Sequence, residues 1–222
     1  MDIVKLVYGP LAMRAARRAL VGRVRVRLSP ERGRFTREDV ARVLDGAWRR
    51  YDEAVGRLPT QPTRGSAMNV RLACFTVSVL DELLATGAER DYTIELVADA
   101  TWRVYRIWAR LASVTGSKSN ALAFAAKKAS DREGAVSLRF PFNAPGYVIE
   151  EVVTEGGTGF DVVHCPVASY FRERGAVDLC TASWCNLDFA LSEMTHQKLV
   201  RTKTLVRGAD RCDFRILPRN EG

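Results

Sequence analysis

The spacing of apolar residues changes once along the chain, near Gly134, and this change limits the fold more than any other feature. Before it, apolar side chains recur every three or four residues, as in helices with one buried face. After it, short apolar runs bounded by turn residues are typical of strands. The order predicts an α+β fold: an N-terminal helical layer packed on a C-terminal antiparallel sheet with two short helices.

The N-terminal half is expected to hold four helices, the first of which starts at Thr36 and Asp39, a capping signal. They are predicted over residues 36–55, 67–85, 93–115 and 119–130. Residues 1–21 have rough helical spacing, which Gly9 and Pro10 are expected to break. Residues 23–28 alternate basic and apolar side chains, as in a short exposed strand.

The C-terminal half is expected to alternate strands with turns and two short helices. The strands are predicted over residues 136–142, 147–154, 160–164, 199–206 and 212–217, and the helices over 166–174 and 183–194. Residues 143–146 predict a turn, Gly156 and Gly157 a hairpin loop, and residues 208–210 a tight turn between the last two strands.

Basic residues are concentrated at the N-terminus. The net charge is +8; residues 1–50 hold 13 Lys and Arg against 5 Asp and Glu, and the remaining residues hold 21 of each. We therefore divide the chain into a basic arm, residues 1–35, and a single α+β domain, residues 36–222, which is helical over 36–130 and mixed over 135–222. No nucleic-acid-binding motif accompanies the charge.

The N-terminal segment also helps to predict in which cellular compartment the protein lies. Arginines at positions 14, 17 and 18 stand where a signal peptide needs apolar residues. The five cysteines are odd in number and lack the spacing of a disulfide framework. We expect a cytoplasmic protein with reduced thiols and no membrane-spanning helix.

Four of the five cysteines fall between Cys165 and Cys212, and this segment is predicted to form one reactive site. Pro166 after Cys165 predicts that the thiol caps a helix, where free N–H groups favour a thiolate. Cys185 and Asp188 share one face of the predicted helix 183–194. Alternation in the last strand directs either Cys212 or Asp213 inward, and we choose Cys212.

Other interpretations of these cysteines stay open. Cys74 lies in an apolar helix, where a cysteine usually fills space, and Cys180 is equally consistent with filler or function. Zinc is a weaker alternative, because no Cys-x-x-Cys pair is present, although His196 is available as a fourth ligand. We expect no cofactor, with zinc as the remaining option.

Four motifs in this segment resemble the L-2-amino-thiazoline-4-carboxylic acid hydrolases, bacterial enzymes that open a cyclic thiazoline to a carbamoyl-cysteine. They are FDVVHCP at 160–166, WCNLDF at 184–189, RTKTL at 201–205 and GADRCDF at 208–214. The resemblance is specific over residues 160–216, looser over 68–105, and does not reach residues 1–35.

The resemblance implies a hydrolase that acts on a cyclic amidine-type C–N or C–S bond. Such a reaction needs a nucleophile, a proton donor and a cation for the substrate carboxylate. We assign Cys165 as nucleophile, Asp188 as acid and base, Cys185 and Cys212 as catalytic neighbours, Arg201 or Lys203 as the carboxylate clamp, and Asp213 as a further substrate-binding residue.

Two alternatives belong to other functional classes. The pocket could bind a small molecule or sense metal or redox state without catalysis, as in 4-vinyl-reductase-like domains. The basic N-terminus could make a protein of the membrane periphery. We expect a small-molecule substrate and no nucleic acid, with membrane contact and a homo-oligomer as open options.

Overall fold

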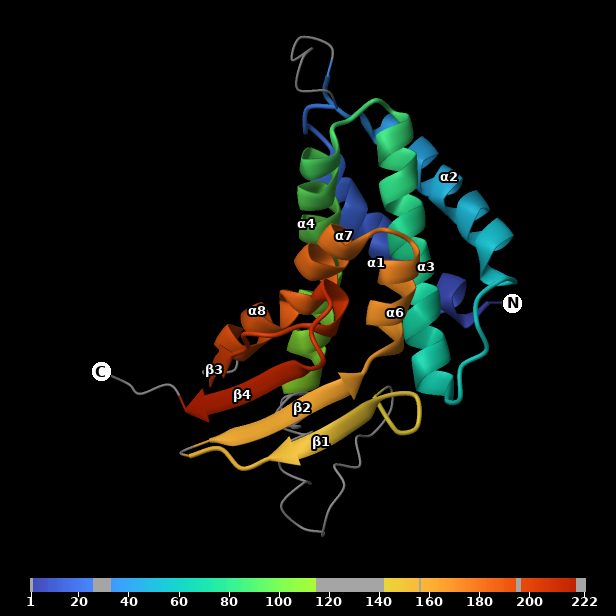
Figure 1. The fold of residues 1–222 in the computed structure, drawn as a ribbon. Helices are drawn as coiled ribbons and strands as arrows, with labels where there is room; N and C mark the ends of the chain where they lie inside the picture. Colours follow the sequence, from blue (N-terminus) through green and yellow to red (C-terminus); the bar gives the residue numbers. More distant parts are fainter. Residues whose placement is uncertain (1, 26–32, 115–141, 156, 195–196, 219–222) are drawn as a thin grey trace.

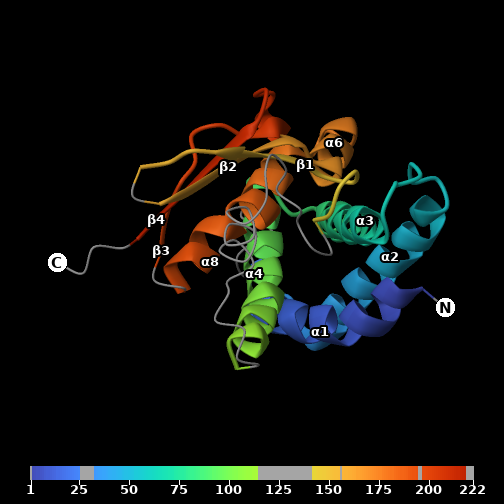
Figure 2. The ribbon, with the colours of Figure 1, turned by 90° about the horizontal axis from the view of Figure 1, so that it is seen from below.

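A computed structural model describes residues 2–25, 33–114, 142–155, 157–194 and 197–218 (Figure 1). Four long helices form the N-terminal layer, and a four-stranded sheet with short helices follows them in the chain. The long helices are α1 (Ile3–Leu20), α2 (Arg37–Val55), α3 (Arg64–Ala85) and α4 (Arg90–Val114). Helix α4 lies between α1 and the short helices near the sheet (Figure 2).

Capping boxes fix where α2 and α3 begin. Thr36 accepts a hydrogen bond from the backbone of Asp39, whose carboxylate accepts one from the backbone of Thr36. Thr63 and Ser66 repeat this arrangement at α3. Each cap satisfies N–H groups that the first helical turn leaves free. The predicted helices 36–55 and 67–85 are confirmed, and α4 confirms the helix predicted over 93–115.

Helix α1 differs from its prediction, because it continues through Pro10. Proline removes one backbone hydrogen bond, a cost that tertiary packing can outweigh. The packing is present: Ala15, Ala16, Ala19 and Leu20 are buried. Val4, Ala16 and Leu20 belong to the same apolar cluster as side chains of α2 and α3. The division of the chain at residue 35 stays a prediction.

The sheet comprises four antiparallel strands within the described residues, in the order β1-β2-β4-β3. They are β1 (Val148–Val152), β2 (Thr158–His164), β3 (Gln197–Val200) and β4 (Cys212–Pro218). One face is apolar, and its buried side chains, here called the sheet cluster, are Phe160, Val162, Leu199, Cys212, Phe214 and Ile216. The predicted α+β fold is confirmed.

The short helices correct one prediction. After α6 (Pro166–Glu173) come α7 (Val177–Cys180), a π-helical segment η2 (Thr181–Cys185) and α8 (Leu187–Met194). The helix predicted over 183–194 is therefore wrong at its start: helical backbone begins earlier and widens at η2. The Asn186 N–H donates to the carbonyl of Thr181, five residues back.

The predicted antiparallel pairing of the last two strands is confirmed, but the tight turn predicted at 208–210 directly between them is wrong. Strand β3 ends at Val200, and residues 201–211 leave the sheet and include a 3-10 turn, η3 (Leu205–Arg207). The Asp213 carboxylate explains the detour, because it accepts hydrogen bonds from the backbone N–H groups of Thr202 and Lys203 at 2.9 and 2.5 Å. These donors are thereby removed from the sheet ladder.

Three further predictions concern residues 23–28, 119–130 and 136–142. The strand over 23–28 is not seen in its described part, where isolated bridges join Val21 to Phe35 and Val24 to Arg34. The helix over 119–130 and most of the strand over 136–142 lie outside the described residues. No helix among the described residues is long and apolar enough to span a bilayer.

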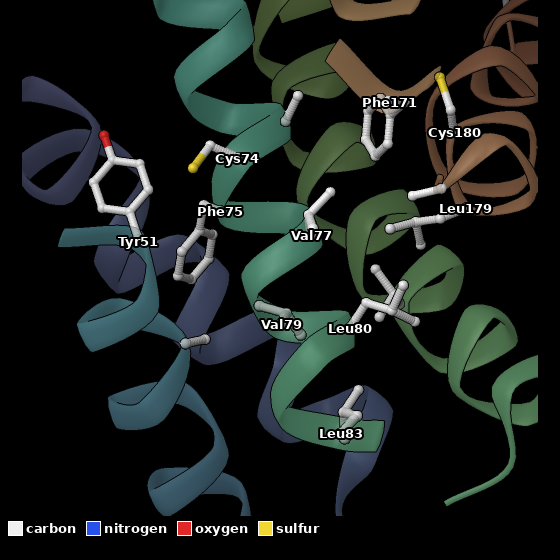
Figure 3. Packing of buried hydrophobic residues seen from close by; sticks show 14 of the residues in the cluster. Tyr51, Cys74, Phe75, Val77, Val79, Leu80, Leu83, Phe171, Leu179 and Cys180 are labelled. Carbon is white, nitrogen blue, oxygen red and sulfur yellow. The ribbon is translucent and has the colours of Figure 1, made fainter. Parts of the chain in front are cut away.

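A second, larger group of buried side chains lies among the helices and is called here the helical cluster. It joins α1 to α4 with α6 and α7, and Phe75, Leu80, Phe171 and Leu179 are among its members (Figure 3). Trp48 stacks on Phe75 with 3.8 Å between ring centroids. Cys165 and Leu205 pack against both the helical and the sheet cluster, so they mark where the two meet.

Gly146 brings the chain against the start of α3. A Cβ at this position would lie 2.6 Å from the hydroxyl oxygens of both Thr63 and Ser66. The next residue, Tyr147, is buried and accepts a hydrogen bond from Asn69 of α3. The absence of a side chain at Gly146 therefore allows Tyr147 to reach the interior.

We predict that Gly146→Ala lowers the free energy of unfolding by about 1–3 kcal/mol, because the added methyl group displaces the capping hydroxyls. Gly56→Ala is the matched control: its Cβ meets nothing within 4 Å and its φ is −70°. Urea unfolding should show a lower midpoint for Gly146→Ala alone. Equal midpoints for the two variants would contradict the close approach.

Candidate functional site

Four cysteines converge between the helical cluster and the apolar face of the sheet. Cys165 precedes α6, Cys180 ends α7, Cys185 ends η2, and Cys212 begins β4. Their charges influence one another: Cys185 and Cys212 act on the pKa of Cys165, and all three act on that of Cys180. With Asp188 and Arg201 they form what we call the thiol site. All five cysteines of the chain are free thiols.

Cys180 and Cys185 form the closest pair, with 3.9 Å between their sulfur atoms. The hydrogen bond from Cys180 lowers the pKa of Cys185 and is aided by the charges of Arg201 and Arg207; burial and Asp188 oppose it. The same contact, together with burial, raises the pKa of Cys180. Cys185 is partly exposed. It is therefore the thiol of this pair best suited to be a reactive thiolate.

Cys165 occupies the position predicted for it, at the N-cap of α6. Its sulfur accepts a hydrogen bond from the backbone N–H of Ala168 at 3.4 Å. The expected thiolate is not favoured, however, because burial raises the pKa of Cys165 to about 12. Loss of hydration outweighs the N–H groups of the helix start.

Cys212 points into the sheet cluster, as the alternation of the last strand predicts. The backbone N–H of Leu205 donates to its sulfur at 3.2 Å. Burial raises the pKa of Cys212 to about 11, with a further contribution from Cys185. Cys212 is thus a neutral, positioned thiol near neutral pH.

Asp188 and Arg201 form the charged part of the site. Arg201 donates to the Asp188 carboxylate at 2.8 Å and to the backbone carbonyl of Cys185 at 3.0 Å. Its guanidinium lies over the rings of Phe189 and Phe214, at 4.9 and 5.2 Å from their centroids. Burial raises the pKa of Asp188 to about 6 although Arg201 lowers it. A quarter of the Asp188 side chain, 25%, remains exposed.

The predicted proximity of Cys185 and Asp188 rests on a different local structure from the one expected. They do not share one regular helix, because η2 ends at Cys185 and α8 begins at Leu187. Arg201 instead binds both residues. The charge of Asp188 also acts on the pKa of Cys185, which agrees with their closeness.

Two tyrosines at the site were not found from the sequence. The hydroxyl of Tyr147 accepts a hydrogen bond from Asn69 at 2.8 Å, and burial, followed by the charge of Cys165, raises its pKa. Burial and the charge of Asp188 raise the pKa of Tyr105. No local motif marks these residues, because they reach the site through contacts between distant parts of the chain.

Lys203 and Asp213 lie apart from the thiols. Asp213 holds the loop after β3, and its carboxylate also accepts a hydrogen bond from the Thr202 hydroxyl at 2.6 Å. The Lys203 ammonium is exposed, 3.6 Å from Asp210. Substrate binding by these two residues stays a prediction.

The zinc site and the membrane contact stay predictions. Among the described residues, no group of three or more His, Cys, Asp and Glu side chains could hold a metal ion. His196 lies outside those residues. A surface hollow of about 690 Å³ on α1, away from the thiol site, is lined by Arg14, Arg17, Arg18 and Arg37 among others. Contact of this basic surface with a membrane stays a prediction.

The α+β fold thus brings four thiols, a carboxyl group and a guanidinium together at one site. A family model described as L-2-amino-thiazoline-4-carboxylic acid hydrolase matches residues 74–216. The chain belongs to this hydrolase family, and the match includes the whole thiol site. No curated protein and no solved structure matches the chain.

The site's order of thiol reactivity can be measured directly. With limiting iodoacetamide at neutral pH, Cys185 should be alkylated first, because Cys165 and Cys185 are both partly exposed and only the pKa of Cys185 is lowered. Cys165 and Cys212 should react more slowly, and Cys74, whose pKa is raised by burial, should serve as the slow internal standard. Peptide mass spectrometry assigns each site. Initial alkylation at Cys165 would contradict this order.

Proposed function

We propose that the chain hydrolyses the ring of a thiazoline carboxylic acid, with Cys185 as nucleophile and Asp188 as general acid. The observation that carries the proposal is the arrangement around Arg201, which binds the Asp188 carboxylate and the backbone of Cys185 together. Family membership supplies the substrate class. The nucleophile thus differs from Cys165, the residue assigned from the sequence, because burial keeps the Cys165 thiol protonated.

The first step is attack of the Cys185 thiolate on the ring carbon between sulfur and nitrogen. A carbon–sulfur bond to the enzyme forms, and the ring carbon–sulfur bond breaks. Asp188 in its protonated form donates a proton to the departing ring sulfur. The pKa of about 6 keeps a useful fraction of Asp188 protonated near neutral pH.

The second step restores the enzyme. Asp188, now a carboxylate, takes a proton from water, and the water oxygen attacks the same carbon. The bond to Cys185 breaks and the thiolate leaves, which yields a carbamoyl-cysteine from a 2-amino-thiazoline. One water is consumed, and both residues return to their initial protonation states.

The substrate carboxylate needs a cation at the site. The sequence suggests Arg201 or Lys203, but Arg201 is 3% exposed and already engaged with Asp188. Arg207 offers another cation, because it is exposed and its charge acts on Cys185. A guanidinium is well shaped to bind a carboxylate through two hydrogen bonds.

The direct test is turnover of 2-amino-thiazoline-4-carboxylate, detected by mass spectrometry as addition of one water. Cys185→Ser should lower kcat by about a thousandfold or more, since a hydroxyl is a far weaker nucleophile at neutral pH. Cys74→Ser, in the helical cluster and away from the site, should keep kcat near the parent value. Retained turnover in Cys185→Ser with loss in Cys165→Ser would make Cys165 the nucleophile.

The role of Asp188 gives a separate prediction on pH. An acid must be protonated to act, so kcat/KM should fall as pH rises above about 6, the pKa of Asp188. Asp188→Asn should lower kcat by about 10²–10⁴-fold and remove that falling limb. If kcat/KM instead rises through this pH range and Asp188→Asn removes the rise, the carboxylate form of Asp188, and not its acid form, limits the reaction.

A further inference from the structure

Cys180 and Cys185 are arranged so that one thiol is reachable and the other is not. Cys180 is 1% exposed, whereas Cys185 is partly exposed. Figure 3 shows the Cys180 sulfur directed away from Leu179 and Leu80, which face each other in the helical cluster. The Cys180 thiol is thus buried within the helical cluster, and the sulfur of Cys185 lies 3.9 Å from its own.

The π-helical segment η2 makes this pairing possible. In a π-helix, hydrogen bonds join residues five apart, so Cys180 and Cys185 lie one above the other on the same side. The two sulfur atoms are 3.9 Å apart, and a disulfide bond is about 2 Å long, so the two thiols need to approach each other by about 2 Å to be joined.

We propose that Cys180 and Cys185 form a reversible disulfide when the protein meets a hydroperoxide. Cys185 is oxidised first, and Cys180 then reacts with the oxidised Cys185 to close the disulfide. Neither the family description nor the proposed function assigns this modification. The disulfide itself rests on the geometry of the pair alone. Its consequence, loss of ring hydrolysis, rests on the proposed function, because Cys185 would no longer be available as the nucleophile.

The chemistry balances with a hydroperoxide as the oxidant. The Cys185 thiolate attacks the terminal peroxide oxygen, the O–O bond breaks, and the leaving alkoxide, or hydroxide from hydrogen peroxide, takes a proton from solvent and departs as an alcohol or water. Cys185 becomes a sulfenic acid, oxidised by two electrons. The Cys180 sulfur then attacks the Cys185 sulfur, the S–O bond breaks, and water departs with the Cys180 proton. A dithiol reductant restores both thiols by exchange.

The other two thiols of the site are less suited to resolve Cys185. The sulfur of Cys165 is held by the N–H of Ala168, and that of Cys212 by the N–H of Leu205. Both residues stand on elements separate from η2, at the start of α6 and of β4. Cys180 lies in the same continuous helical stretch as Cys185, and so it is always near.

Mass spectrometry of tryptic peptides can detect the Cys180–Cys185 disulfide directly. Trypsin should release one peptide from Gly175 to Lys198, which contains Cys180 and Cys185 and no other cysteine. After hydrogen peroxide and alkylation, this peptide should lack two hydrogen atoms and carry no alkyl group. Dithiothreitol before alkylation should restore two alkylation sites. In Cys180→Ser, Cys185 should instead be trapped by dimedone as a sulfenic acid, while Cys74→Ser should form the disulfide normally.

Far-UV circular dichroism of each variant confirms that it is folded. Cross-linking of Cys185 to Cys165 or Cys212, or a dimedone adduct on Cys185 in the folded parent chain, would overturn the proposal. The two proposals fail separately: disulfide formation in a chain that does not turn over thiazoline refutes only the proposed function. Turnover that continues unchanged in the fully oxidised protein refutes Cys185 as nucleophile and leaves the disulfide intact.

Discussion

The site depends on the hydrogen bonds that the buried Arg201 guanidinium donates to Asp188 and to the Cys185 carbonyl. A charge that is 3% exposed is costly unless it is paired, and Asp188 and the Cys185 carbonyl supply its partners. Removal of one partner from a buried ion pair typically costs about 3–5 kcal/mol. The rings of Phe189 and Phe214 enclose the guanidinium from α8 and from the sheet. One residue thus joins β4, α8 and the end of η2.

The chemical differences among the cysteines follow from this arrangement. All are thiols of the same kind, and burial raises the pKa of Cys165 and Cys212. Cys185 differs because a thiol donor and two arginines surround it. A single Asp188 with a pKa near 6 then complements a thiolate. The fold thus raises the pKa of Asp188 through burial, and it lowers that of Cys185 through a hydrogen bond and the charges of two arginines.

Local signals in the sequence predicted much of the framework. Thr36 with Asp39 marked a helix start, and Pro166 marked Cys165 as a cap, because both depend on neighbours in the chain. The π-helix at η2 has no such signal, since its extra residue per turn is stabilised by packing. The loop after β3 does not form the predicted tight turn, because the Asp213 carboxylate binds the backbone of Lys203, ten residues earlier. The Asn69–Tyr147 pair likewise joined the site only through the tertiary fold, whereas Cys180 meets Cys185 through the unpredicted π-helical turn.

The central claim is that Cys185 forms a bond to the substrate carbon beside Asp188. The most direct measurement is acid quenching during turnover of 2-amino-thiazoline-4-carboxylate, followed by mass spectrometry of the Gly175 to Lys198 peptide. The account predicts a peptide whose Cys185 carries the mass of one substrate and cannot be alkylated. A Cys185 thiol that stays free at every quench time during turnover, or an adduct on Cys165, would contradict it.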